Sequence, residues 1–187
     1  RSMAERMTAG DLYLADDPEL AAAHLRCMDL QEAYNASSAR DGEARAALLR
    51  ELLGSCGEGV VIRPPILLDY GRNVSIGSGT FANYNLVALD VAAITIGADC
   101  QIAPNVQLLT AWHPLEPVAR RNKWEAASPI TIGDNVWLGG GVIVLPGVTI
   151  GDNTVVGSGA VVTKDLPANV VAVGNPARIV RHLDGPA

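Results

Sequence analysis

The sequence predicts a mainly β protein in which short parallel strands wind into a helix of stacked coils. Residues 132–161 consist of five consecutive six-residue units in one phase, and each unit begins with Ile, Leu or Val. Apolar residues make up 49% of the 187-residue chain but aromatic residues only 4%, so the interior must be narrow and aliphatic. Repeats of six residues are typical of parallel β-helices, in which each coil contacts only its neighbours.

Two helices are predicted before the repeat, within an N-terminal segment that spans residues 1–57. Apolar residues recur at helical spacing between residues 8 and 53, and the polar stretch 35–42 would link the two helices. Asp17 and Pro18 form a start signal, with Asp17 as the cap and Pro18 at the first helical position. We expect this segment to cover the open end of the repeat, and contributing substrate contacts is the alternative role.

The repeat itself is predicted to span residues 58–166. Its phase shifts by two residues between Asp90 and Ile94, which predicts a bulge or a small insertion at a corner. At Pro167 the period is broken, so residues 167–187 are expected to form a tail. In the first half of the repeat, the residues expected at the recurring inward position are Tyr70, Ile76, Ala82, Ile96, Ile102 and Leu108.

One interruption separates the two halves of the repeat. Residues 110–129 do not follow the period, and the stretch 120–123 is too charged to lie inside a stack, so an extruded loop is predicted. The loop carries His113, the one histidine that lies within the span of the repeat. A loop histidine is often bonded to backbone, and this reading stays open for His113. His24 and His182 are assigned structural roles because they lie in a predicted helix and in the tail.

Charge and cysteine content restrict the function. The chain has 20 acidic and 14 basic residues and a net charge of −6, which argues against a nucleic-acid partner. Its three cysteines have no zinc-type or redox-motif spacing, so we expect a reduced, cytoplasmic protein. No apolar stretch approaches the roughly 20 residues of a membrane-spanning helix, and we expect no membrane partner.

Several short stretches resemble the maltose and galactoside O-acetyltransferases, a branch of the hexapeptide-repeat acyltransferases that includes the nodulation-factor acetyltransferases. The stretches that carry the resemblance are Met7–Tyr13, Asp69–Gly71, Phe81–Asn85, Ala103–Val106, His113–Pro114, Pro129–Gly133 and Val173–Arg178. The resemblance implies a left-handed parallel β-helix and a homotrimer with active sites between neighbouring subunits. It also implies that acetyl-coenzyme A gives its acetyl group directly to a sugar hydroxyl, without a covalent enzyme intermediate.

A sugar hydroxyl attacks a thioester poorly while it keeps its proton, so the reaction needs a base, and histidine suits that task near neutral pH. The resemblance implies that His113 is this base. It also implies that Asn83 donates a hydrogen bond to the oxyanion of the tetrahedral intermediate. From the residue alone, Asn83 could equally be a corner residue of the repeat.

The resemblance suggests carboxylates that bind the hydroxyl groups of the acceptor. The candidates are Asp69, Asp90 and, in the N-terminal segment, Asp16 or its neighbour Asp17. Two positions depart from the family, because some relatives have Ser in place of Asp69 and an acid in place of Val91. The preference for one acceptor over another therefore stays open.

Coenzyme A carries phosphates, a pantetheine arm and an adenine, so its site should combine a few cations with a run of backbone groups. The residues that match the coenzyme contacts of the family are Trp137, Gly140, Ser158, Thr163, Lys164, Arg178 and Arg181. From composition alone, Arg178 and Arg181 would form a solvated face, and Trp137 would be plain packing.

Three other functions are compatible with a six-residue repeat. A metal-dependent hydratase needs several ligands close together, and one histidine in the repeat does not supply them, so no metal is expected. A non-catalytic assembly protein would be expected to lose the site residues, whereas this chain keeps His113, Asn83, Lys164 and Arg178. An acetyltransferase for an antibiotic or for serine is disfavoured by the stretch Met7–Tyr13. The sequence therefore predicts a sugar O-acetyltransferase that depends on acetyl-coenzyme A.

Overall fold

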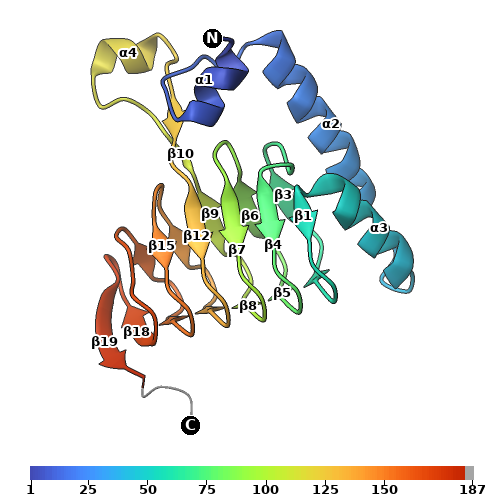
Figure 1. Ribbon diagram of the computed structural model, residues 1–187, viewed down its shortest axis with the longest axis vertical. Coiled ribbons are helices and arrows are strands. Elements are labelled where there is room, and N and C mark those ends of the chain that lie inside the picture. The colour runs from blue at the N-terminus through green and yellow to red at the C-terminus, as the bar shows by residue number, and fades with distance from the viewer. Residues whose placement is uncertain (184–187) are drawn as a thin grey trace.

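The chain folds into a three-sided prism of stacked β-coils with helices packed at its N-terminal end (Figure 1). The computed structural model describes residues 1–183. Helices α1 (Met3–Ala9), α2 (Pro18–Asn35) and α3 (Gly42–Leu52) precede the first strand, and α4 (Pro117–Arg121) lies in a loop that leaves the prism. In Figure 1, α2 and α3 lie beside the first coils, and α1 lies toward the loop of α4.

Each side of the prism is a parallel sheet whose strands come from successive coils. Sheet 1 contains β1 (Ser55–Cys56), β4 (Val74–Ile76), β7 (Ile94–Ile96), β12 (Ile130–Ile132) and β15 (Thr149–Ile150). Sheet 2 contains β2 (Val61–Ile62), β5 (Phe81–Ala82), β8 (Gln101–Ile102), β13 (Trp137–Leu138), β16 (Val155–Val156), β18 (Val170–Val173) and the antiparallel β19 (Arg178–His182). Sheet 3 contains β3 (Ile66–Leu68), β6 (Leu86–Leu89), β9 (Gln107–Leu109), β14 (Ile143–Val144) and β17 (Val161–Val162). We name each edge of the prism after the sheets that it joins: 1–2, 2–3 and 3–1.

The coils differ in length. Ile76 pairs with Ile96 and Ile132 pairs with Ile150, so an early coil contains 20 residues (96 − 76) and a later one 18 (150 − 132). The two extra residues lie at the 3–1 edge, where β6 ends and β7 begins. The phase shift predicted within residues 90–94 is therefore confirmed, and it gives the early coils a corner that the later coils lack.

Tyr70 does not occupy the inward position that the six-residue count assigns to it. The strand register pairs Leu68 with Ala88, so Leu68 is the inward residue of that coil. The prediction for Tyr70 is wrong because the same insertion also occurs one coil earlier, between β3 and β4. Tyr70 instead packs in a second apolar cluster with Met7, Tyr13, Leu20, Val91 and Ala127.

Helix α2 begins and ends where the sequence predicts. The Asp17 side chain accepts the backbone N–H of Glu19 at 2.9 Å, and Pro18 is the first helical residue. The chain between Asn35 and Gly42 links α2 to α3. Among residues 1–183, none of the helices is long and apolar enough to cross a membrane.

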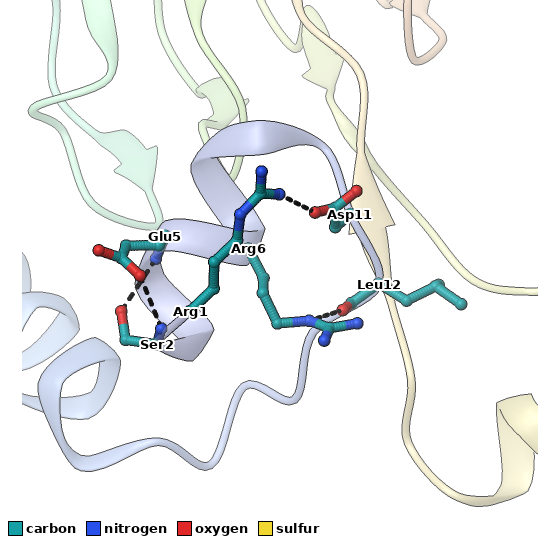
Figure 2. Close-up of polar contacts among 6 residues, drawn as sticks. All are labelled: Arg1, Ser2, Glu5, Arg6, Asp11 and Leu12. Atoms are coloured by element: carbon teal, nitrogen blue, oxygen red, sulfur yellow. Dashed lines mark hydrogen bonds and ion pairs between the residues drawn. The ribbon is translucent and has the colours of Figure 1, made fainter.

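Helix α1 was not predicted, because it is too short to show an apolar periodicity. Its signal is a capping box, in which Ser2 Oγ accepts the backbone N–H of Glu5 at 3.1 Å and the Glu5 carboxylate accepts that of Ser2 at 2.8 Å (Figure 2). Arg6 Nε donates to the carbonyl of Leu12 at 2.6 Å (Figure 2). This bond folds the chain back after α1, so that Tyr13 is directed toward the loop.

Helix α2 covers the free edge of the first coil. The Gln31 side-chain oxygen accepts the backbone N–H of Leu68 at 2.7 Å. The Asn35 side chain both accepts the N–H of Ile66 and donates to its carbonyl, each at 2.9 Å. The hydroxyl of Tyr34 donates to a carbonyl of β2. These side chains bond backbone groups that a preceding strand would otherwise bond. Helix α2 thus covers the open end of the repeat, as was expected of the N-terminal segment.

The strands of the prism extend beyond the predicted span of 58–166. Strand β1 already pairs with β4 from Ser55, and β18 pairs with β16 within the stretch that was expected to be a tail. The interior is a column of aliphatic side chains, as the composition indicates, and Ile94, Ile130 and Leu138 are fully buried in it.

The extruded loop lies between β9 and β12. Its two ends, β10 (Ala111–Trp112) and β11 (Ala126–Ala127), pair as the antiparallel strands of a hairpin. It is tied to the N-terminal segment, because Tyr13 and Glu125 exchange backbone hydrogen bonds of 2.9 and 3.1 Å. The Arg6 guanidinium also lies 5.6 Å from the centre of the Trp124 ring. Trp124 of the loop thus contacts the N-terminal segment of its own chain.

A glycine at the 1–2 edge lets adjacent coils approach closely. A Cβ atom on Gly77 would lie 2.5 Å from the backbone nitrogen of Ala98 and 2.6 Å from the carbonyl carbon of Gly97, whereas one on Gly42 would meet nothing within 4 Å. We expect Gly77→Ala to lower the free energy of unfolding by about 2–3 kcal/mol, because backbone must move. Gly42→Ala should change it by less than about 1 kcal/mol. Urea titrations followed by circular dichroism would measure both, and equal effects would contradict this account of the corner.

Candidate active site

His113 lies where the hairpin leaves the prism at the 3–1 edge. It lines a hollow of about 500 Å³ between the hairpin, helix α2 and the corner after β3, which we call the His113 hollow. An adjoining hollow of about 470 Å³ is also lined by His113 and brings in Asp16. Three predicted site residues, His113, Asp16 and Asp69, are thus gathered in one region. The side chains with polar groups that line the His113 hollow are Tyr13, His24, Asp69, Tyr70, His113 and Glu125.

Asp69 has a carboxyl group whose pKa is strongly affected by its surroundings. Burial raises the pKa of Asp69 to about 6, the negative charges of Asp90 and Glu125 act in the same direction, and His24 opposes them. Nδ1 of His24 lies 2.8 Å from the backbone carbonyl oxygen of Asp69, which fixes the imidazole against this corner. A carboxyl group with this pKa changes charge close to neutral pH, which is common at functional sites.

Asp90, predicted to contact the acceptor, is fully buried and is not among the residues that line the His113 hollow. Its Oδ1 atom accepts the backbone N–H groups of Asp69 and Tyr70 at 3.0 and 2.9 Å, and Oδ2 accepts that of Asn73 at 3.1 Å. Burial raises the pKa of Asp90, whereas these N–H groups lower it. The carboxylate therefore holds the corner that presents Asp69 to the hollow.

Four polar residues that line the His113 hollow were not predicted to belong to the site: Tyr70, which was expected to point inward, and Tyr13, His24 and Glu125. Tyr13 belongs to a stretch that carries the family resemblance, but no role followed from it. His24 was assigned a structural role because it lies in a helix, yet it lines the hollow beside Asp69. Glu125 lies in the charged loop, and its Oε2 atom is 3.8 Å from Nε2 of His113. Only the pairing of β10 with β11 shows that Glu125 faces His113.

Asn83 lies on a different edge of the prism from His113. It follows β5 at the 2–3 edge, where its side-chain oxygen accepts the backbone N–H of Tyr84 at 2.8 Å. Strand β6 crosses sheet 3 between the two edges, and its four residues span about 13 Å. Asn83 and His113 are therefore not brought together within this chain.

The predicted coenzyme residues form two groups. Trp137 is 55% exposed on sheet 2, and a Cβ atom on Gly140 would lie 3.9 Å from Ser158 Oγ, so the last two residues are neighbours in successive coils. Thr163 and Lys164 follow β17 at the 3–1 edge, the edge of His113. The other group lies on sheet 2 or at the 2–3 edge, which is the edge of Asn83. It comprises Trp137, Gly140, Ser158, Arg178 and Arg181.

The histidines and cysteines do not form a common cluster. His182 lies on β19, whereas His24 and His113 line the His113 hollow. All three cysteines are free thiols. In the part of the chain that the structure describes, no group of three or more His, Cys, Asp or Glu side chains is placed to hold a metal ion.

Family profiles match two parts of the chain. A profile described as the maltose acetyltransferase hexapeptide capping motif matches residues 6–57, which contain α2 and α3. A profile described as bacterial transferase hexapeptide, with six repeats, matches residues 129–164, which contain β12 to β17. The two profiles thus correspond to the helices that cover the first coil and to the regular coils after the loop.

Similarity to individual proteins extends over nearly the whole chain. Nodulation protein L of Rhizobium meliloti (strain 1021) is 49% identical over 179 residues, which cover 96% of this chain and 98% of that protein. The crystal structure of a maltose O-acetyltransferase from Clostridium difficile 630 is 44% identical, with a TM-score of 0.97 and 98% of each chain covered. A structure of galactoside acetyltransferase in complex with coenzyme A is 42% identical, with a TM-score of 0.95, and covers 98% of this chain and 92% of that one. The covering helices, the six-residue coils and these similarities together show that the chain belongs to the maltose and galactoside O-acetyltransferase family of hexapeptide-repeat proteins.

Proposed function

We propose that the protein transfers the acetyl group of acetyl-coenzyme A to a hydroxyl group of a sugar of the maltose or galactoside kind. The family supports this proposal, and a structure of one relative contains coenzyme A. The observation that carries it is the position of His113 in one hollow with Asp69 and Glu125. A base beside a carboxylate, here that of Asp69, which can accept hydrogen bonds from hydroxyl groups, suits O-acyl transfer to a sugar.

In this reaction His113 takes the proton of the acceptor hydroxyl while the hydroxyl oxygen attacks the carbonyl carbon of the thioester. The tetrahedral intermediate carries a negative oxygen, and the side-chain amide of Asn83 donates a hydrogen bond to it. When the intermediate collapses, the carbon–sulfur bond breaks and the departing thiolate of coenzyme A takes the proton from His113. The acetyl group passes directly to the acceptor, and His113 returns to its starting state.

The active sites in this proposal lie between the subunits of a homotrimer. Asn83 and His113 belong to different edges of one subunit, so a site that uses both must combine the 2–3 edge of one subunit with the 3–1 edge of its neighbour. The candidate coenzyme residues divide in the same way, with Gly140 and Ser158 on the edge of Asn83 and Lys164 on the edge of His113. A repeated contact between two different edges closes into a ring, as in a cyclic oligomer.

Coenzyme A is assigned to the groove between these two edges. Lys164, Arg178 and Arg181 supply positive charge for its phosphates, Thr163 and Ser158 supply polar groups, and the remaining contacts come from Trp137 and the backbone at Gly140. Arg178 and Arg181 are both exposed on β19, where a ligand can reach them. The use of acetyl-coenzyme A as the acetyl donor and the presence of three free thiols fit a location in the reducing cytoplasm.

Replacing His113 with Ala should lower kcat by about 10²- to 10⁴-fold, because the acceptor then keeps its proton during attack. The Kd for coenzyme A should change little, since the imidazole acts on the acceptor. Consumption of acetyl-coenzyme A with glucose, maltose, galactosides and chitin fragments would measure turnover, and calorimetric titration would measure Kd. Unchanged turnover in His113→Ala would rule out His113 as the base.

Two inactive variants should restore activity to each other if the site lies between subunits. In a mixed trimer of Asn83→Ala and His113→Ala chains, an intact His113 can face an intact Asn83 of the next subunit. Random mixing of equal amounts makes about one site in four complete, so about a quarter of the wild-type activity is expected from co-expressed chains. Each variant alone should stay at its own low level. Absence of recovery in trimers shown by native mass spectrometry to be mixed would contradict a shared site.

The KM for the acceptor should depend on pH through Asp69. Burial favours the protonated form of this acid, so the ionised form, which accepts hydrogen bonds from two hydroxyl groups, dominates only above a pKa of about 6. We expect the acceptor KM to rise several-fold as the pH falls from about 7.5 to about 5. Asp69→Asn does not titrate, and its KM should be raised but nearly constant over this range. The same pH dependence in both proteins would remove Asp69 from the acceptor site.

A further inference from the structure

The hairpin that carries His113 places Glu125 directly opposite it. Ala111 pairs with Ala127 and Trp112 with Ala126, so the next pair along the two strands is His113 with Glu125. Side chains of a cross-strand pair stand on the same face and are close enough to interact. The distance of 3.8 Å between Nε2 of His113 and Oε2 of Glu125 agrees with this placement. The contact thus follows from the antiparallel pairing of the two strands.

The backbone and the carboxylate of Glu125 are both held in place. The backbone exchanges two hydrogen bonds with Tyr13, of 2.9 and 3.1 Å, and Trp124 before it lies under the Arg6 guanidinium. Burial raises the pKa of the Tyr13 phenol, and a hydrogen bond with the Glu125 carboxylate raises it further. The Glu125 side chain is only 17% exposed, whereas that of His113 is 56% exposed. The carboxylate is therefore the fixed member of the pair and the imidazole is the accessible one.

Several other charged groups lie near His113, but they are placed differently. Asp69 and His24 line the same hollow, and Asp16, Arg120 and Lys123 line the adjoining one. Within residues 1–183, Glu125 provides the carboxylate that lies within 4 Å of a ring nitrogen of His113. The group that responds most directly to a positive charge on the imidazole is therefore Glu125.

We propose that Glu125 is a positioning residue for His113, one that orients the imidazole toward the acceptor and balances the positive charge that the imidazole gains. The proposal rests on the proposed role of His113 as the base. During attack, one proton moves from the acceptor hydroxyl oxygen to a ring nitrogen of His113, and it passes from there to the coenzyme thiolate when the carbon–sulfur bond breaks. Glu125 stays ionised throughout and takes up no proton. Its effect is greatest in the transition state, when His113 carries its charge, so it acts on kcat.

The first test is a comparison of Glu125→Gln with the wild type. Glutamine keeps the length of the side chain and can still accept the Tyr13 hydroxyl, so the backbone pairing with the N-terminal segment should persist. We expect kcat to fall about 10- to 100-fold, while the acceptor KM and the Kd for coenzyme A change by less than about threefold. Glu125→Asp, which restores the charge on a shorter side chain, should recover part of the loss. Glu116→Gln is the matched control, because Glu116 lies in the same loop, caps α4 and lines neither hollow, and its kcat should stay within about twofold of the wild type.

A double-mutant cycle with His113→Ala separates this proposal from the one on which it rests. If Glu125 acts through His113, then Glu125→Gln should cost almost nothing further in the His113→Ala background. An equal loss in both backgrounds would overturn the positioning role, and so would a higher acceptor KM at unchanged kcat, which would make Glu125 a ligand of the acceptor. Full turnover in His113→Ala alone would instead refute the proposed base, whatever Glu125→Gln does. Matching thermal unfolding curves for all variants would show that the loop remains folded.

Discussion

The coils of the prism depend on one another for their backbone hydrogen bonds, and the first coil has no coil before it. Gln31 and Asn35 of helix α2 meet this need by bonding the free backbone groups of β3. A helix that lies across this edge also brings an earlier turn to the corner after β3, where His24 contacts Asp69. Protection of an open sheet edge and construction of the His113 hollow are thus results of the same packing.

The longer early coils decide where the hollow lies. Their two extra residues form corners at the 3–1 edge, and the Asp90 carboxylate holds one of these corners through three backbone N–H groups. Asp69 stands on the corner that Asp90 supports, partly desolvated, with its pKa raised. The 18-residue coils that pair Ile132 with Ile150 have no such corner, so they form a regular wall. A buried acid thus shapes the site without lining the hollow.

Much of this fold could be predicted from the sequence, because the repeat and the start of α2 at Asp17 are local signals. Counting back six residues from Ile76 reaches Tyr70, but the two-residue insertion between β3 and β4 makes Leu68 the inward residue. The same insertion occurs in the next coil, so counting along the sequence does not detect the first one. The role of Glu125 could not be predicted, because it depends on the pairing of two strands that α4 separates. The separation of Asn83 from His113 required the register of the sheets. The left-handed sense of the coil stays a prediction from the family resemblance.

The bridge between Tyr13 and Glu125 joins residues 112 positions apart (125 − 13), and it closes one wall of the hollow. Contacts of such sequence separation form late, because the intervening chain must first be ordered. On the ribosome, the first coils can stack as soon as they emerge, but the wall cannot close until Glu125 has been synthesised. A nascent chain can thus begin to stack its first coils before it can form this wall of the hollow.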